Sequence, residues 1–279
     1  MIGSRPLTYS GVTLNSAGGL AVDADPSATF AGASSSRAFS AVSRPGPTER
    51  FTVQAWFRTN TTRGGKIIGY GNSQTGSSGT NDRHVYMDNS GRLNFGVIYG
   101  STRSIVTSTR AYNDNAWHQV TATMGADGMR LYVDGALVAS RTDVTRSNEY
   151  PGFWRIGGDN LANWGNRPTS DFFNGRIDEV AVYHKVLDAA AVSRQYAIGA
   201  TAAVPNRAPQ AVIASTATNL RVDVNGAGSS DADGTIVSYR WDFGDGGVAT
   251  GVTASRTYAN PGTYTLTLLE NLCMLAYPA

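Results

Sequence analysis

Met129-Arg-Leu-Tyr-Val-Asp-Gly-Ala-Leu-Val138 is the stretch that decides the fold class of this chain. Two runs of alternating apolar and polar residues flank Asp134-Gly135, and such a pair between such runs predicts a tight two-residue β-hairpin turn. One hairpin predicts only two strands. Two further segments accompany it, Trp117-His-Gln-Val120 upstream and Phe173-Asn-Gly-Arg-Ile-Asp-Glu-Val180 downstream, the latter followed by Leu187-Asp188. Three such segments in this order favour a β-sandwich that binds a glycan or a surface over an enzyme.

The same alternation recurs along the first two hundred residues. A period of two over short runs is typical of strands in a half-buried antiparallel sheet. The predicted strands are Phe51 to Phe57, His84 to Met87, Leu93 to Val97, Trp117 to Met124 and Met129 to Ala139. The predicted fold class is therefore all-β.

One helix is predicted, from Asp188 to Tyr196. Asp188 can accept hydrogen bonds from the first-turn amides, the following residues are rich in alanine, and Gly199 can end the helix. Residues 1–200 are expected to form the first domain. Residues 201–208 lack periodicity and predict a linker.

A second, smaller β domain is predicted over residues 209–270. Turn-forming Asp-Gly and Asn-Gly pairs separate its strand-like runs. These runs are Gln210 to Ala214, Leu220 to Val224, Ile236 to Phe243 and Gly262 to Leu268. The tail, residues 271–279, does not continue the alternation, which predicts an incomplete second domain.

Composition excludes several classes of protein. Of 279 residues 41% are hydrophobic and 16% charged, as in globular proteins. The net charge is +2 and the basic residues are scattered, so no nucleic-acid partner is expected. Cys273 is the single cysteine, which rules out a disulfide framework. No run approaches the roughly 20 apolar residues of a membrane span, and neither end resembles a natural terminus, so we expect no membrane insertion and a fragment of a larger chain.

The first two hundred residues resemble the laminin-G-like and pentraxin-like jelly-roll domains of the concanavalin A-like lectin group. The resemblance implies a jelly-roll sandwich. It rests on Phe51 to Phe57, Trp117 to Val120, Leu131 to Gly135, Ile156 to Gly158, and Phe173 to Val180 leading to Leu187.

Residues 206–269 resemble a polycystic-kidney-disease (PKD) type domain, an immunoglobulin-like sandwich. The matching motifs are Asp231 to Gly234, Ser238 to Gly246, and Tyr258 to Tyr264. The resemblance implies a spacer in a secreted or cell-surface bacterial protein. Trp241 is expected in its core, Asp242, Asp245 and Gly246 in a turn, and Asp231, Asp233 and Asp245 are candidates for a weak calcium site.

Pentraxins hold calcium between two loops, and the resemblance implies the corresponding ligands here. They are Asn81, Asp82, Asp159, Asn160 and Asp171. Calcium prefers six to eight oxygen ligands, which these residues could supply together. The alternative is that Asp and Asn serve only as turn formers in these loops.

Related jelly rolls also bind a structural calcium through an aspartate of the last core strand. That position is Asp178, and its expected partner loop near the N-terminus is Phe30 to Ser34, which has no acidic residue. A plain hydrogen-bonding role for Asp178 is therefore the alternative.

Sugar binding by stacking needs exposed aromatic rings. Trp164 is the leading candidate, because it lies in the polar loop 159–170, where burial is not expected. Tyr99 is a second candidate, and Arg167 could donate to a sugar. Trp56 and Trp117 lie in alternating strands and are expected in the core.

Enzyme motifs are missing from the sequence. Its glutamates are Glu49, Glu149, Glu179 and Glu270, and none lies in the paired-carboxylate strand of a jelly-roll glycosidase. Asp178 and Glu179 are adjacent and are expected on opposite sheet faces, where they cannot act as a pair.

We therefore expect a non-catalytic module that binds a polysaccharide or a glycosylated surface, with calcium as a possible cofactor. A protein-binding adhesion module and a purely structural spacer of an extracellular hydrolase are the alternatives.

Overall fold

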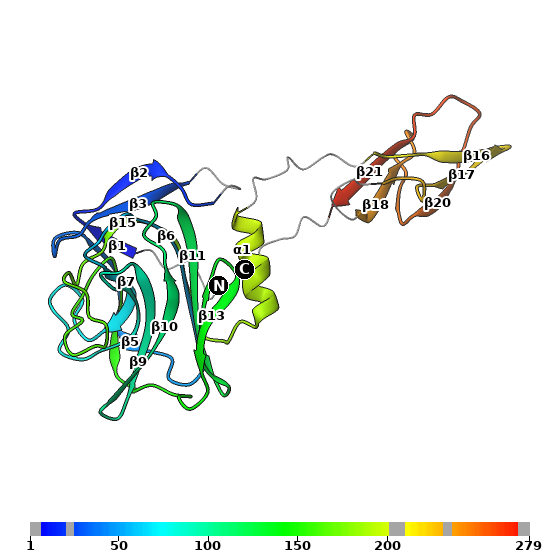
Figure 1. Ribbon diagram of the computed structural model, residues 1–279. Coiled ribbons are helices and arrows are strands. Elements are labelled where there is room, and N and C mark those ends of the chain that lie inside the picture. The colour runs from blue at the N-terminus through cyan, green and yellow to red at the C-terminus, as the bar shows by residue number, and fades with distance from the viewer. Residues whose placement is uncertain (1–6, 21–24, 201–209, 231–235, 273–279) are drawn as a thin grey trace. The chain divides into compact units, whose positions relative to one another are not determined.

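Strand pairing sorts the chain into two units, Met1–Ala202 and Ala203–Ala279. The computed structural model describes residues 7–20, 25–200, 210–230 and 236–272 (Figure 1). The predicted linker 201–208, Asp231, Asp233 and Cys273 lie outside the described residues. The all-β prediction is confirmed in both units.

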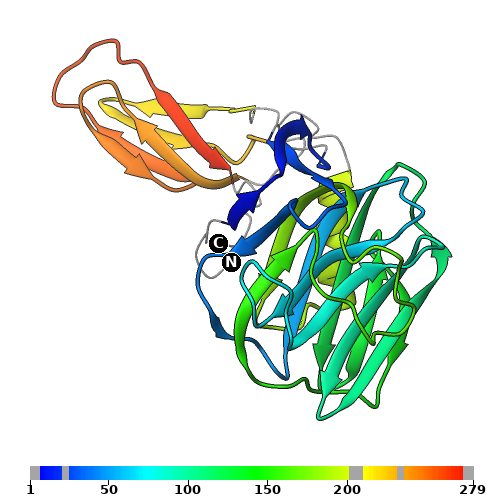
Figure 2. The ribbon, with the colours of Figure 1, turned by 90° about the vertical axis from the view of Figure 1, so that its left-hand side faces the viewer.

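Two antiparallel sheets form the first unit (Figures 1 and 2). Sheet A contains, in spatial order, β1 (Leu7–Ser10), β4 (Arg37–Ser40), β14 (Pro151–Ile156), β7 (Gly65–Gly71), β8 (Asn81–Met87), β9 (Arg92–Tyr99) and β10 (Thr102–Ala111), with β5 (Arg44–Pro45) paired to β14. Sheet B contains β13 (Ala136–Arg141), β12 (Gly128–Val133), β11 (Trp117–Gly125), β6 (Phe51–Arg58), β15 (Asn174–Tyr183), β3 (Pro26–Ala31) and β2 (Thr13–Ala17).

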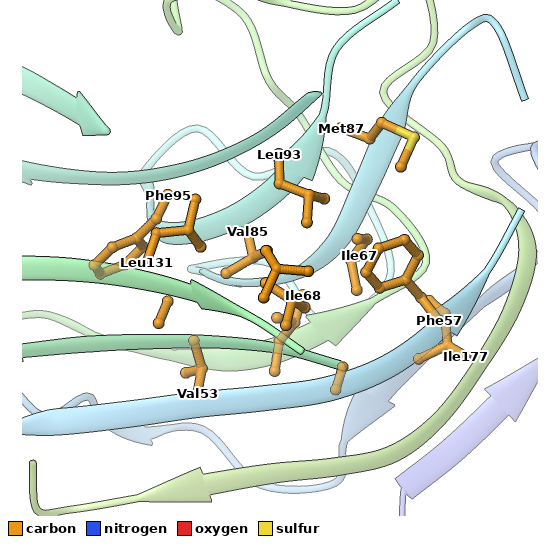
Figure 3. Close-up of a cluster of buried hydrophobic side chains, with 14 of the residues drawn as sticks. Val53, Phe57, Ile67, Ile68, Val85, Met87, Leu93, Phe95, Leu131 and Ile177 are labelled. Atoms are coloured by element: carbon orange, nitrogen blue, oxygen red, sulfur yellow. The ribbon is translucent and has the colours of Figure 1, made fainter. Parts of the chain in front are cut away.

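The core of this unit lies between the two sheets. Alternate residues of β6, such as Val53 and Phe57, meet Val85 of β8 and Phe95 of β9, and all four are completely buried (Figure 3). Neighbouring residues of the same strands therefore point to the outer faces. What lies on those outer faces decides where a ligand could bind.

The predicted hairpin joins β12 and β13. Asp134 and Gly135 have φ angles of 52° and 76°, the left-handed conformation that a tight hairpin turn needs. The Asp134 carboxylate accepts hydrogen bonds from the Gln119 amide, at 3.0 Å, and from His118 Nδ1, at 2.8 Å. The turn is thereby fixed to β11.

The helix α1 (Ala189–Ala200) packs on the outer side of sheet B beside β13 (Figure 1). Asp188 Oδ1 accepts from the Ala191 amide at 2.7 Å, as expected of the cap. The predicted end at Tyr196 is wrong by one turn. Gly199 lies inside the helix, because its bare Cα packs against the Trp56 ring, and Tyr196 stacks on the same ring.

Two three-stranded sheets form the second unit. They are β16 (Ala214–Thr218), β17 (Arg221–Asn225) and β20 (Thr253–Thr257), and β19 (Val248–Thr250), β18 (Ile236–Asp242) and β21 (Thr267–Leu272). Trp241 is completely buried in its core, as predicted.

Several strand limits in this unit differ from the predictions. The last strand begins at Thr267 and reaches Leu272, inside the predicted tail, whereas Gly262 to Leu266 lie in a loop. Stacking of Tyr258 on Tyr264, with ring centroids 3.8 Å apart, fixes that loop. The first strand begins at Ala214, the end of the run predicted for it. Asp242 and Asp245 accept from the Gly244 and Gly247 amides, so the predicted turn is confirmed.

Candidate functional site

The segment 157–173, here called the covering loop, lies over the outer face of sheet A. Its residue Trp164 is only 4% exposed and packs with Tyr86 and Leu161, so the expectation of an exposed ring is wrong. Gly96 of β9 leaves room for the ring, since a Cβ there would lie 2.5 Å from it. The indole Nε1 donates to Asn81 Oδ1 at 2.7 Å. Trp164 therefore fastens the covering loop to the sheet.

Three of the residues predicted to bind calcium meet at Ser78. Asn160 Nδ2 and Asn81 Nδ2 donate to the Ser78 carbonyl oxygen at 2.9 and 3.2 Å. The Ser78 amide donates to Asp159 Oδ1 at 3.0 Å. The two loops thus converge, as the pentraxin resemblance implied.

The carboxylates of this set already have cationic partners. Asp159, which is buried, lies 3.6 Å from Lys66 Nζ and 3.7 Å from Arg155. Burial lowers the pKa of Lys66 to about 8, and the charge of Asp159 opposes that shift. Burial acts to raise the pKa of Asp159, but Lys66 and Arg155 hold it below its usual range.

The other two aspartates are also paired. Asp82 lies 3.4 Å from the Arg83 guanidinium, and Asp171 accepts from Arg167 at 3.2 and 3.1 Å. A calcium ion would have to displace these cations, so the side chains as they stand do not fit one. Calcium binding by this set stays a prediction.

Tyr99 keeps an exposed ring among the predicted sugar-stacking residues. Its exposed fraction is 51%, and the Arg146 guanidinium lies 5.4 Å from the ring centroid. Arg167 is held by Asp171 and is half exposed. Sugar binding by these residues remains a prediction.

Asp178 lies in a different setting from the one expected. Its Oδ2 accepts from the Gly19 amide at 2.7 Å, so its partner loop is residues 18–25 and not Phe30 to Ser34. That loop supplies an acid: carboxylate oxygens of Asp25, Asp178 and Glu179 all lie within 4.8 Å of one another. We call these three residues the acidic cluster.

The prediction that Asp178 and Glu179 lie on opposite faces is therefore wrong. Glu179 has a φ angle of 46°, and the pairing of β15 with β6 shifts register between Asp178 and Ala181. This irregularity cancels the alternation of an ordinary strand. Burial, followed by the charge of Asp25, raises the pKa of Asp178 above its ordinary value. A cation bound between these carboxylates would relieve both effects.

A row of four residues crosses the outer face of sheet B next to this cluster. Trp117 is paired with Arg58, Arg58 with Arg176, and Arg176 with Thr29, each on the adjacent strand. Their neighbours Phe57 and Ile177 are buried in the core, so this cross-strand row faces outward. All four residues are half-buried, which corrects the expectation that Trp117 belongs to the core.

The row borders a hollow of about 260 Å³. Its lining is polar apart from one glycine, and consists of Thr29, Arg58, Thr59, Asn60, Asn115, Gly175 and Arg176. Arg58 Nε donates to the Asn115 carbonyl oxygen at 2.7 Å, which fixes the guanidinium at the rim.

Gly19 links the hollow to the acidic cluster. Its amide holds Asp178, and its Cα lies against the Trp117 ring, where a Cβ would come within 3.0 Å. Sequence reasoning missed this region. The available signal was the period of two that sets Arg176 and Asp178 on one face of a strand.

Known proteins share parts of this chain. Residues 31–193, more than half of the chain, match the model of the concanavalin A-like lectin/glucanases superfamily, and residues 206–271 match a PKD domain. A pre-pro-metalloprotease, PrtV of Vibrio cholerae, is 50% identical over 40 residues, which cover 14% of this chain. Collagenase ColQ1 of Bacillus cereus is 50% identical over 42 residues, or 15% of this chain. The matched segment spans 4% of the length of each protease.

Among solved structures, the binding domain of botulinum neurotoxin serotype G is similar in fold, with a TM-score of 0.53 and 14% identity. The match covers 97% of this chain and 61% of that one. Among the described residues, none of the helices could span a membrane.

Proposed function

This chain belongs to the concanavalin A-like lectin/glucanases superfamily and carries a PKD domain after its jelly roll, and from this premise we propose that it is a non-catalytic carbohydrate-binding module of an extracellular protein. The PKD unit would act as a spacer. The two curated relatives are a metalloprotease and a collagenase, which supports a place beside an extracellular hydrolase.

The observation that carries the proposal is the cross-strand row with its hollow. Sugars are bound by an aromatic surface combined with planar polar side chains that donate and accept in fixed directions. Trp117 offers the aromatic surface, and Arg58, Arg176, Asn60 and Asn115 offer the planar polar groups beside it. This face of sheet B is hollowed, whereas the outer face of sheet A is filled by Trp164 of the covering loop.

Calcium is part of the proposal, at the acidic cluster. Calcium takes oxygen ligands from carboxylates, backbone carbonyls and water, and Asp25, Asp178 and Glu179 would supply the carboxylates. The raised pKa of Asp178 supports this position, since it reflects burial and then the charge of Asp25, without a compensating cation. Through Gly19 the ion would also fix the loop on which Trp117 packs.

The proposal is tested by glycan binding of the whole chain with calcium present. Replacing Trp117 by alanine removes the aromatic surface and should weaken binding about tenfold, the effect of losing roughly 1.4 kcal/mol. Tyr99→Ala is the matched control, because Tyr99 is an exposed ring of the other sheet, and this variant should bind normally.

Other outcomes identify the alternatives. Loss of binding in Tyr99→Ala alone would move the site to the edge predicted from the sequence. Capture of a protein partner that survives deglycosylation would favour an adhesion module. Shortened oligosaccharides recovered after incubation would contradict the non-catalytic assignment.

A further inference from the structure

We infer that Arg58 and Arg176 form a subsite for an anionic group of the glycan, a carboxylate or a sulfate ester, so that the ligand is an acidic polysaccharide. This inference rests on the proposed function and names the chemical class of its ligand.

The first argument is the position of the two arginines. They are directly opposite each other on β6 and β15 and share the outer face of sheet B. Like charges directly opposite each other on neighbouring strands destabilise a sheet. A pair that persists in the wall of a hollow has a reason for being there if an anion binds between the two charges.

The second argument is that the protein itself does not neutralise this pair. Within the described ranges neither Arg58 nor Arg176 forms an ion pair. The nearby Asp114 is bound to His118 Nε2 at 3.0 Å. Asp178, two residues along β15, accepts from the Gly19 and Glu179 amides.

The third argument is that the site is built before a ligand arrives. Asn115 holds Arg58 through Nε, which leaves its two terminal nitrogens for a ligand. Guanidinium groups bind carboxylate and sulfate oxygens through two parallel hydrogen bonds. Thr29 and Asn60, also in the lining, can bond the neutral hydroxyls of the same sugar. The hollow thus combines charge with neutral polar groups, as an acidic sugar requires.

Calorimetric titration of the whole chain with polygalacturonate, dextran sulfate and neutral dextran tests the inference. The wild type should bind at least one acidic polymer at least tenfold more tightly than dextran, and more weakly as salt rises. Arg176→Gln should remove that preference. Arg50→Gln is the matched control, because Arg50 is exposed and precedes the other end of β6.

Thermal melting separates binding from structural roles. Arg176→Gln removes a like-charge neighbour, so its Tm should equal or exceed that of the wild type while acidic-glycan affinity falls. A lower Tm together with unchanged affinity would overturn the inference.

The remaining outcomes distinguish the inference from the proposed function. Binding of neutral glycans alone, unaffected in Arg176→Gln, would overturn the acidic subsite and leave the carbohydrate-binding function standing. If no glycan binds, inorganic sulfate is titrated while the arginine Nε signals are followed by NMR. Shifts confined to Arg58 and Arg176 would support the anion subsite with the carbohydrate function rejected, and their absence would overturn both.

Discussion

Single residues decide which faces of this sandwich are open. Trp164 and Trp117 exchange the places expected from the sequence: Trp164 is buried under the covering loop, and Trp117 is half-buried on an outer face. Alternation tells which residues share a face but not what covers that face. Gly96 and Gly19, the glycines on which the two rings pack, are signals that can be understood only once the strands are paired.

Asp178 shows both the reach and the limit of prediction at this scale. Its position in the last core strand indicates a buried acid, which the structure confirms. Its acidic neighbours could not be predicted, because the positive φ of Glu179 breaks the alternation and Asp25 comes from a distant loop.

Calcium should stabilise the first unit through Asp178. Millimolar calcium is expected to raise the Tm of the whole chain by about 5 °C relative to EDTA, because only the folded state assembles the three carboxylates. Asp178→Asn should abolish the rise. Asp171→Asn, which affects only the set paired with Arg167, should keep it.

Opposite results are informative. A rise that is lost in Asp171→Asn and kept in Asp178→Asn would assign the ion to the pentraxin-like set. In EDTA the raised pKa of Asp178 means that the folded state binds more protons, so stability should fall as pH rises through its titration. Asp178→Asn should make that slope shallower.

His118 should make stability depend on pH near neutrality. Burial acts to lower its pKa, but hydrogen bonds to Asp134 and Asp114 raise it above its ordinary value. Both ring nitrogens face carboxylates, and only the imidazolium can donate to both. The stabilisation is complete below the unfolded-state pKa and is lost as pH rises through the folded-state pKa.

His118→Gln should therefore cost more stability at about pH 5.5 than at about pH 8.5 in denaturant titrations. Equal losses at both values would show that the imidazole serves only for packing.

At the scale of elements, local chemistry predicts starts better than ends. The Asp134-Gly135 hairpin and the Asp188 cap follow from side chains adjacent in sequence, and both are confirmed. The helix end depends on a tertiary contact, the packing of Gly199 on Trp56, which no local pattern contains. The last strand of the second unit was misplaced for a similar reason, the stacking of Tyr258 on Tyr264.

The packing of α1 gives a sharp test. Glycine to alanine inside a helix usually stabilises by up to about 1 kcal/mol. In Gly199→Ala the new methyl would lie 2.6 Å from the Trp56 ring, so a loss of about 1–2 kcal/mol is expected instead. Ala190→Gly, at an exposed position, should lose about 1 kcal/mol by propensity alone. A more stable Gly199→Ala would contradict the tight contact.

For the whole molecule, sequence patterns were sufficient to identify two β-sandwich units and their families, since strand periodicity and turn residues recur along the entire chain. They did not identify the hollow, whose lining comes from β3, β6, β15 and two loops that meet only in the folded sheet. A scaffold can be predicted from local order, whereas a binding surface depends on the register between strands.

The central claim is that a glycan binds the outer face of sheet B at the cross-strand row. Amide NMR spectra of the whole chain, recorded during titration with acidic oligosaccharides in calcium, test it most directly. We predict shifts concentrated at Thr29, Arg58, Trp117, Gly175 and Arg176. Shifts centred instead on Tyr99, Asn160 and Arg167, or no shifts with any oligosaccharide, would contradict the claim.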